Sequence, residues 1–485
     1  SLTKLMPVSC ERRSDLSIVM IVVIIQIMTK WRPDPGSLTR PAYRSLVQTI
    51  ETAIQNGVLK PGDRMPTQRQ LAFDLSLSVQ TVSRAYDKLV EAGKIVGEVG
   101  RGTFVRAASD EISMPFVSRK AAGRLLDMSI LKPVLDHAHE EAMQKTLRAL
   151  ARSLPRAMMG GFRQDLRAGD SSSAVRRWLS LCGLDLQGMA VIPTNGSTSA
   201  MTVAMMTAAQ PGDLIVSEDI GHHTLRPLAR FLGIRLQGVS VDAGGICPEA
   251  LERICAKEPV KAVYLIPNGA NPLAFTMTES RRAAVIEVAR RHDLLIIENQ
   301  SWGPLQDAPP PPMAAMAPER VLYFTSLTKC LMPGLRVGYL VVPDHLGASA
   351  ANRHMVTSWM ATNMMTEIAG RWIEEGTAQT LLNRQQLALR DRADFAANVF
   401  RGLDMRTSPN GLHLWLPCRD IYEEAELVKS IRESGVAVAN GASFAIGPPD
   451  RHPGLRIAVG GQSFPEFARG IRMIDARLRN RGRTE

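Results

Sequence analysis

Cysteine is scarce and widely spaced in this chain of 485 residues, which contains only six. No two of them form a Cys-x-x-Cys pair, so the sequence offers neither a disulfide framework nor a zinc-binding pattern. We therefore expect no metal site and a reducing, cytoplasmic location. The six are Cys10, Cys182, Cys247, Cys255, Cys330 and Cys418.

Long apolar runs are also nearly absent. The one membrane-like segment, Leu16–Met28, has about 13 residues, whereas a helix needs roughly 18 or more to span a bilayer. No small-residue cleavage site follows it, which argues against a signal peptide. The stretch that begins at Met28 reads like a natural start, so we expect residues 1–27 to be an upstream extension. We assign all of residues 1–35 to an N-terminal extension outside the first domain. A short membrane-attached arm is the alternative.

Charge is distributed unevenly along a chain of otherwise ordinary globular composition. With 45% hydrophobic and 22% charged residues, disorder, a collagen helix and a coiled-coil rod are excluded. Residues 1–106 hold 15 basic and 9 acidic side chains, residues 451–485 hold 8 and 3, and the remainder is balanced. A neutral body with basic ends indicates that one end, not the whole chain, meets a polyanion such as nucleic acid.

Three helices and a hairpin are predicted between residues 36 and 106. Apolar residues recur at helical spacing from Pro41 to Asn56. Thr67 offers an N-cap to a second helix, and Ser78 caps a third that ends near Gly93. Two short β-like runs, 94–98 and 99–105, then predict a hairpin.

This arrangement is that of a winged helix-turn-helix, whose third helix enters the major groove of DNA. Gln80 can read adenine, and Arg84 can reach guanine or a phosphate. Arg69 would lie against the DNA backbone, while Arg101 at the wing tip could reach the minor groove or a phosphate. The alternative is that these arginines are solvated surface charge, as most single arginines are.

Residues 57–105 resemble the DNA-binding domain of the GntR regulators along their whole length. The match includes LKPGDRMPT at 59–67, TVSRAY at 81–86 and GRGTFV at 100–105. Val79 stands where that family often has a DNA-contacting arginine, a departure that concerns the operator sequence and not DNA binding itself. The resemblance implies DNA contacts from Arg69, Ser78, Gln80, Thr81, Arg84, Gly100 and Arg101.

Beyond a linker predicted at residues 107–125, strand-like apolar runs alternate with amphipathic helices. This alternation is typical of an α/β domain with a mainly parallel sheet, whose ligand binds at the carboxyl ends of the strands. The predicted strands cover residues 190–193, 214–217, 262–266, 294–297, 321–325 and 337–342, and one of the helices covers residues 280–291.

Several residues at these strand ends could hold a phosphorylated aldehyde. Lys329 can form a Schiff base, while Ser326, Thr328 and Arg336 could bind the phosphate. The segment TNGSTS at 194–199 opens a helix and leaves backbone N–H groups free for an anion. Each feature alone has a structural explanation, such as a surface lysine or an ordinary turn.

Two further residues carry polar groups to the same region. Asn271, before Pro272, can donate to a phenolate-type oxygen of a ring cofactor, although making a turn is the commoner role of Asn-Pro. Arg456 lies in an apolar strand, where a carboxylate partner is expected.

Together these motifs resemble the fold type I pyridoxal-phosphate (PLP) enzymes of the aspartate aminotransferase kind, from about Met128 to Arg477. A GntR-like head on such a body is the architecture of the MocR regulators, and GLHLWLP at 411–417 also resembles theirs. The resemblance implies a multidomain chain. A winged helix-turn-helix (α+β, residues 36–106) precedes an α/β fold type I PLP-dependent transferase-like domain (126–485) with a small C-terminal α+β subdomain from about residue 380.

The resemblance also implies the roles of single residues. Lys329 would carry the PLP Schiff base, and Asn271 would bind the ring hydroxyl. Arg456 would bind the carboxylate of an amino-acid-like effector. The phosphate would be held by Gly196, Ser197, Thr198, Ser326, Thr328 and Arg336.

Three departures from the family concern the cofactor ring. Members usually have an aspartate that keeps the pyridine nitrogen protonated and, three residues later, a tyrosine; here Asn299 and Trp302 stand in those places. His222 replaces the ring-stacking aromatic. Glu298 is the nearest acid, but strand alternation should point it away from a group served by Asn299. Such a pocket should bind PLP yet catalyse poorly.

The leading hypothesis is a cytoplasmic, homodimeric transcription regulator that binds a double-stranded DNA operator and senses an amine, an amino acid or PLP itself. A working aminotransferase with an appended DNA-binding head is one alternative. A DNA-binding module on a scaffold that no longer binds the cofactor is another.

Overall fold

The computed structural model describes residues 31–60, 62–91, 94–98, 102–105, 125–159 and 172–480. The chain divides into two compact units, residues 1–113 and 114–485. Three features predicted from the sequence lie outside the described residues: most of the amino-terminal extension, the wing tip with Gly100 and Arg101, and the linker up to residue 124.

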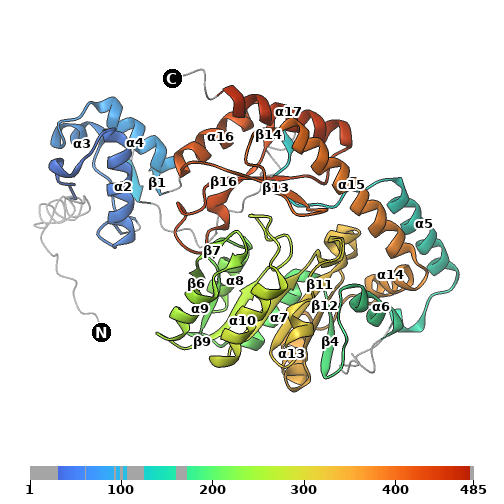
Figure 1. Ribbon diagram of the computed structural model, residues 1–485. Helices are drawn as coiled ribbons and strands as arrows, with labels where there is room; N and C mark the ends of the chain where they lie inside the picture. Colours follow the sequence, from blue (N-terminus) through green and yellow to red (C-terminus); the bar gives the residue numbers. More distant parts are fainter. Residues whose placement is uncertain are drawn as a thin grey trace, which may run out of the picture. The chain divides into compact units, whose positions relative to one another are not determined.

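The first unit contains three α-helices and a β-hairpin in its described part, drawn in blue in Figure 1. Its strands are antiparallel, with Ile95 opposite Val105. Its elements are η1 (Pro35–Ser37), α2 (Ala42–Gln55), α3 (Gln68–Asp74), α4 (Val79–Glu91), β1 (Ile95–Glu98) and β2 (Gly102–Val105).

Local caps and a small apolar core build this unit. The Thr67 side chain accepts a hydrogen bond from the Gln70 amide at the start of α3 (3.2 Å). Leu46 on α2 and Leu89 on α4 are fully buried in the shared core. Trp31 packs against the same core. The segment from residue 31, which the sequence assigned to an extension outside the fold, therefore contacts this unit.

The second unit is built on a seven-stranded sheet in the order β4-β12-β11-β10-β9-β5-β6. Only β12 is antiparallel to its neighbours, while the other four pairings are parallel. The strands are β4 (Met189–Thr194), β5 (Leu214–Glu218), β6 (Arg235–Val239), β9 (Val260–Leu265), β10 (Leu295–Gln300), β11 (Val321–Ser326) and β12 (Gly338–Pro343). Almost every residue of the central strands is buried, as expected for a sheet covered on both faces.

Helices follow the strands and cover the sheet (Figure 1). Helix α7 contacts four of the strands and packs against α13. The helices are α5 (His137–Arg152), α6 (Ser173–Leu181), α7 (Ser197–Ala208), α8 (Leu225–Phe231), α9 (Pro248–Cys255), α10 (Glu279–Arg291), α11 (Met313–Met316), α12 (Leu327–Cys330), α13 (Asp344–Ser358) and α14 (Asn363–Glu374). Short 3-10 turns occur at η3 (Arg156–Met158), η5 (Gly303–Leu305) and η6 (Pro333–Leu335), and β7 (Val241–Asp242) pairs with β8 (Gly245–Ile246).

The C-terminal part of this unit forms a smaller subdomain around a three-stranded antiparallel sheet in the order β13-β16-β15. Strand β3 (Leu126–Asp127) returns to this subdomain and pairs with β14. The other elements are α15 (Thr377–Val399), β13 (His413–Pro417), α16 (Ile421–Glu433), β14 (Val436–Ala437), β15 (Ala439–Asn440), η7 (Gly441–Phe444), β16 (Gly454–Ala458) and α17 (Phe464–Arg479). The fold class predicted from the sequence is confirmed.

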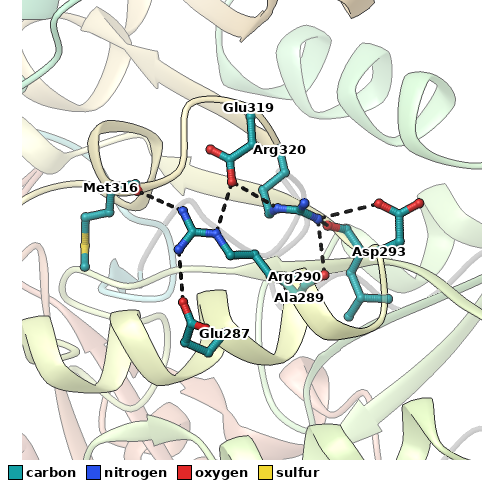
Figure 2. Close-up of polar contacts among 8 residues, drawn as sticks. Glu287, Ala289, Arg290, Asp293, Met316, Glu319 and Arg320 are labelled. Atoms are coloured by element: carbon teal, nitrogen blue, oxygen red, sulfur yellow. Dashed lines mark hydrogen bonds and ion pairs between the residues drawn. The ribbon is translucent and has the colours of Figure 1, made fainter.

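An ion-pair network ties the end of α10 to the turn before β11 (Figure 2). The Nε atoms of Arg290 and Arg320 each lie 3.2 Å from Glu319 Oε1. Arg320 Nη1 also donates to the carbonyls of Ala289 (3.2 Å) and Leu294 (3.1 Å). The network therefore fixes where β10 and β11 begin, and hence where their functional carboxyl ends lie.

No helix in the described part of the chain is long and apolar enough to cross a membrane. The apolar run Leu16–Met28 is not among those residues.

Candidate functional site

Lys329 lies on a single helical turn, α12, directly after the carboxyl end of β11. The hydroxyl of Ser326 caps this turn by accepting from the Thr328 amide (3.1 Å), and it donates to the carbonyl of Val337 (3.1 Å). The hydroxyl of Ser326 thus acts both as a donor and as an acceptor, and both hydrogen bonds hold the turn that carries Lys329. The side chain of Lys329 donates from Nζ to the carbonyl of Leu131.

The surroundings of Lys329 favour its neutral form. Burial, and after it the positive charges of Arg456, Arg336 and Lys132 in that order, together lower the pKa of the lysine to about 8. At pH 7 about a tenth of such a group is unprotonated, far more than for an ordinary lysine. A neutral amine is the form that attacks an aldehyde.

An anion cradle lies beside Lys329, where α7 begins. Gly196 caps α7 with φ of +82°, and no side chain among the described residues caps the helix. Arg336 donates from Nη2 to the carbonyl of Asn195 (3.2 Å), and a Cβ on Gly196 would lie only 3.0 Å from that nitrogen. The hydroxyl of Thr328 is buried and makes no hydrogen bond within the described residues. Free backbone N–H groups, a guanidinium and an unused hydroxyl fit a phosphate.

The other two residues predicted for the cradle lie on the first turn of α7. Ser197 is half-buried and Thr198 is exposed. Their position at a helix start makes their backbone amides, rather than their side chains, the groups suited to an anion.

Arg456 on β16 is fully buried and closes the opposite side of the site. It donates from Nη1 to Asn271 Oδ1 (3.4 Å) and from Nη2 to the carbonyl of Ser129, and it lies 5.0 Å from the ring centroid of Phe444. Its Nε makes no hydrogen bond within the described residues. Burial lowers the pKa of Arg456 to about 9, while the negative charge of Asp127 raises it. Asp127 is therefore a nearby acid, and the Nε–H group of Arg456 is left as an unused donor in the site.

His222 follows β5 and faces the same charges. Burial, and after it the positive charges of Lys329 and Arg456, lower the pKa of His222 to about 4, so the imidazole is neutral at pH 7. Its ring is stacked on His223, with centroids 4.7 Å apart, and Nδ1 lies 2.8 Å from the Thr224 hydroxyl. The structure therefore supplies a flat, neutral ring at this position.

Asn299 lies at the end of β10 and is already bonded through both ends of its amide. Its Nδ2 donates to the Tyr264 hydroxyl (2.6 Å), while Oδ1 accepts from the amide (3.0 Å) and hydroxyl (2.6 Å) of Ser301. Trp302 donates from Nε1 to the carbonyl of Asn268 (3.0 Å). Glu298 points elsewhere, accepting from the amides of Met313 and Ala314. No charged partner for a pyridine nitrogen is thus provided by these residues.

The structure brings into this site residues that sequence reasoning missed. His413 on β13 bonds through Nε2 to the Pro272 carbonyl (3.1 Å), and its buried Nδ1 has no partner within the described residues. Burial lowers the pKa of His413 to about 3, and the charge of Arg456 lowers it further. His413 belongs to GLHLWLP, so a signal existed. The backbone carbonyls of Ser129 and Leu131, which accept hydrogen bonds from Arg456 and Lys329, could not be found from the sequence, because every residue type has a backbone carbonyl.

In the amino-terminal unit, the predicted DNA-contacting residues gather around the start of α4. Ser78 is the cap, accepting from the Thr81 amide (3.1 Å) and lying 2.7 Å from its hydroxyl. Gln80 is exposed, as is Arg69 on α3. The guanidinium carbon of Arg84 lies 4.1 Å from the ring centroid of Tyr43 on α2. That stacking holds Arg84 on the face where α2 and α4 begin.

Comparison with known families matches each unit to a different one. Residues 131–469 match the family of class I and II aminotransferases, and residues 42–105 match the bacterial regulatory proteins of the gntR family. The aminotransferase match covers well over half of the chain.

Two curated relatives and one solved structure span most of the chain. YdeF of Bacillus subtilis (strain 168), an uncharacterized HTH-type transcriptional regulator, is 26% identical over 92% of this chain and 96% of its own length. PdxR of Corynebacterium glutamicum, an HTH-type pyridoxine biosynthesis transcriptional regulator, is 24% identical over 77% of this chain and 82% of its own. Kynurenine aminotransferase of Pyrococcus horikoshii shares the fold, with a TM-score of 0.68 and 19% identity, covering 74% of this chain and 91% of that one.

Proposed function

The chain belongs to the class I and II aminotransferase family and carries a GntR-type DNA-binding domain ahead of that body, and from this MocR arrangement we propose a transcription regulator that uses PLP as a sensor. Its ligand would be an amine, an amino acid or PLP itself. We further propose that it acts in the cytoplasm as a homodimer, because two winged-helix heads suit repeated operator half-sites.

One observation carries the proposal: Lys329 is half-buried and has a lowered pKa, while Asn299 has no charge to offer a pyridine nitrogen and already uses its oxygen and one N–H in hydrogen bonds to Ser301 and Tyr264. When bound, PLP supplies an aldehyde that joins covalently to a primary amine. Lys329 would hold that aldehyde, and Arg336 with the start of α7 would hold the phosphate. Without an anionic partner at Asn299 the ring is a weak electron sink. Binding is thus favoured over turnover.

Signal transmission follows from the position of Arg456. This residue lies on the C-terminal subdomain and contacts Asn271, which follows β9 of the large sheet. A carboxylate that binds Arg456 would therefore act on the junction between the two parts of the unit. If the ligand binds one arrangement of this junction more tightly than another, it shifts the protein toward that arrangement. The shift would change how the DNA-binding heads fit their operator.

Spectroscopy of the purified protein tests the proposal. We expect addition of PLP to give a yellow protein whose absorbance depends on Lys329, and Lys329→Ala to abolish that band. Persistence of the band in the variant, or its absence in the wild type, would overturn PLP sensing and favour the module without cofactor. Specific, salt-sensitive binding to DNA around its own gene is the second requirement.

A working aminotransferase is the competing function, favoured by the intact lysine and phosphate cradle. It predicts conversion of an amino donor in the presence of 2-oxoglutarate or pyruvate. We expect no turnover at a useful rate, because Asn299 cannot supply the charge.

A further inference from the structure

A second pocket lies in the same unit, lined by residues of the β7–β8 hairpin, of the segment after Pro272 and of the C-terminal subdomain. It has a volume of about 640 Å³, within the range of small-molecule sites. Residues of the β7–β8 hairpin line one side, the segment Leu273–Phe275 lines another, and the C-terminal subdomain contributes Arg406, Trp415 and Arg451–Pro453. None of these residues belongs to the candidate cofactor site.

The charged groups of the pocket favour an anion. Arg451 uses only Nη1, which donates to Asp219 (2.7 Å) and Ser240 (3.5 Å), and nearly half of its side chain is exposed. Arg406 uses Nε and Nη2 for Asp404. Within the described chain, the remaining guanidinium nitrogens of both arginines make no hydrogen bond. Their unused donors are therefore available to a ligand.

The one acid of the lining does not oppose this charge. Asp242 is bound by Arg281 (2.9 Å) and by the amide of Gly244 (2.7 Å). These contacts lower the pKa of Asp242 although its partial burial raises it, so the carboxylate is ionised and already paired. Arg406 and Arg451 therefore remain the residues of the pocket with unused hydrogen-bond donors.

The walls of the pocket favour a flat apolar body. Phe275 is half-buried and supplies an aromatic ring among the lining residues, and Leu273 and Pro453 add apolar surface. The indole of Trp415 is almost fully buried, with Leu273 packed against its cluster, so it supports the wall from within. An aromatic ring such as that of Phe275 binds a planar ligand with little loss of side-chain freedom.

We propose that this pocket binds a small organic anion with a flat apolar body, at a site separate from the PLP site. The anionic group binds Arg406 and Arg451, and the apolar body lies against Phe275, Leu273 and Pro453. The proposal goes beyond the sensing of amines at Lys329, since it requires neither the lysine nor the cofactor.

Three segments of chain run from this pocket into the candidate cofactor site. Leu273–Phe275 directly follow Asn271 and Pro272. Arg451 and His452 both bind Asp219, three residues before His222. Trp415 is the cross-strand partner of Arg456. A ligand in the pocket therefore contacts the far ends of the segments that hold three of the cofactor-site residues, and its binding is coupled to that of PLP.

Calorimetry on the full-length protein, with benzoate as the probe, tests the site. Benzyl alcohol is the control that keeps the ring without the charge, and acetate is the control that keeps the charge without the ring. We expect saturable binding of benzoate and much weaker binding of either control. The double variant R406Q/R451Q should weaken benzoate binding about tenfold or more, because charge-assisted hydrogen bonds are lost. Arg235→Gln, a change at an exposed arginine that pairs with Glu258 outside both sites, should leave it unchanged.

Several results would overturn the proposal: no saturable benzoate binding, equal affinity in R406Q/R451Q, or an equal loss of binding in Arg235→Gln. Because Arg451 also binds Asp219, Ala243→Trp provides a second variant that fills the rim and keeps both arginines. It should also lose benzoate binding.

The PLP absorbance separates this site from the proposed function. We expect the band to persist in R406Q/R451Q and in Ala243→Trp, since neither variant touches the PLP site. Its absence from the wild type would contradict PLP sensing but leave the benzoate result standing. Benzoate affinity measured with and without PLP should differ, and identical values would overturn the coupling.

Discussion

Asn299 on β10 donates a 2.6 Å hydrogen bond to the hydroxyl of Tyr264 on the neighbouring strand β9. Burial holds the pKa of Tyr264 well above its usual value, so the phenol remains neutral. A neutral amide and a neutral phenol therefore meet at the position that we propose to face the pyridine nitrogen. The contact depends on the asparagine side chain, so substitutions of Asn299 test whether the missing negative charge limits amino-group transfer.

Asn299→Asp should increase amino-group transfer. A carboxylate at this position would accept hydrogen bonds from Tyr264 and Ser301 and place a negative charge near the pyridine nitrogen. We expect transfer from an amino donor to 2-oxoglutarate or pyruvate to rise about tenfold or more, equivalent to about 1.4 kcal/mol in the barrier. The measurement is steady-state formation of the new amino acid.

Asn299→Ala is the control, because it removes the amide side chain without adding charge. It should show no gain in transfer. If Asn299→Asp retains PLP and is folded but transfers no faster than the wild type, the missing charge is not what limits catalysis.

Covalent capture of PLP should accelerate with rising pH up to about 8. The folded lysine has its pKa lowered to about 8 by burial and by nearby positive charge, and only the neutral amine reacts. Below that value the rate should fall about tenfold for each pH unit. Stopped-flow absorbance between pH 6 and 9 measures it. Arg456→Gln removes the largest charge effect and should move the midpoint upward; an unshifted midpoint would mean that Arg456 does not influence the lysine.

Glu218 should make the protein less stable as pH rises toward neutrality. Burial, with a contribution from Asp219, raises the pKa of this carboxyl from 4.5 to about 7 in the folded state. The folded form therefore binds the proton more tightly than the unfolded form, and the stability gained below pH 4.5 is lost as pH passes 7. The difference corresponds to about 3 kcal/mol.

Glu218→Gln keeps the shape of the side chain but removes this titration. Urea unfolding at pH 5 and pH 8 should show that the wild type loses more stability than the variant over that interval. Parallel changes in both proteins would mean that Glu218 is not the group responsible. Neither measurement requires PLP.

Tyr43 should matter for DNA binding although it is not a predicted DNA contact. Its ring lies 4.1 Å from the Arg84 guanidinium and holds that side chain in place. A stacking contact of this kind at an exposed position is worth about 0.5–1 kcal/mol, so Tyr43→Leu should weaken operator binding about two- to fivefold. Arg84→Ala should cost more, about 1–3 kcal/mol. Fluorescence anisotropy at fixed salt measures both.

Tyr43→Phe separates the ring from the hydroxyl, which accepts a 3.1 Å hydrogen bond from Arg44. It should bind DNA like the wild type. An equal loss in the phenylalanine and leucine variants would assign the effect to the Arg44 contact instead.

Much of the fold could be predicted from local sequence. Thr67 and Ser78 cap the helices that they were expected to cap, because capping depends on residues only three positions apart. Strands β5, β9 and β11 fall within two residues of their predicted ends, since buried parallel strands form continuous apolar runs. The antiparallel direction of β12 was not predicted, because the same apolar run fits either direction.

The site was predictable where one residue type carries one function. Lys329 lies on a turn after a strand, as its motif indicates, and Arg336 lies beside the start of α7. What could not be predicted depends on residues distant in sequence. The contact between Asn299 and Tyr264 joins two strands, and the Ser129 carbonyl reaches Arg456 from 327 positions away. His413 lay in a recognised segment, but its polar side chain gave no sign of its neighbours.

Arg456 makes ligand binding measurable without any knowledge of the ligand. Burial opposes the charged form of Arg456, and its Nε makes no hydrogen bond within the described residues, so a molecule that brings a carboxylate to it should stabilise the fold as well as occupy the proposed site. Amino acids should therefore raise the melting temperature more than the corresponding simple amines, which bring no carboxylate to the guanidinium. A thermal melting screen of amine pairs that differ only in a carboxylate would thus identify the natural effector class from the protein alone.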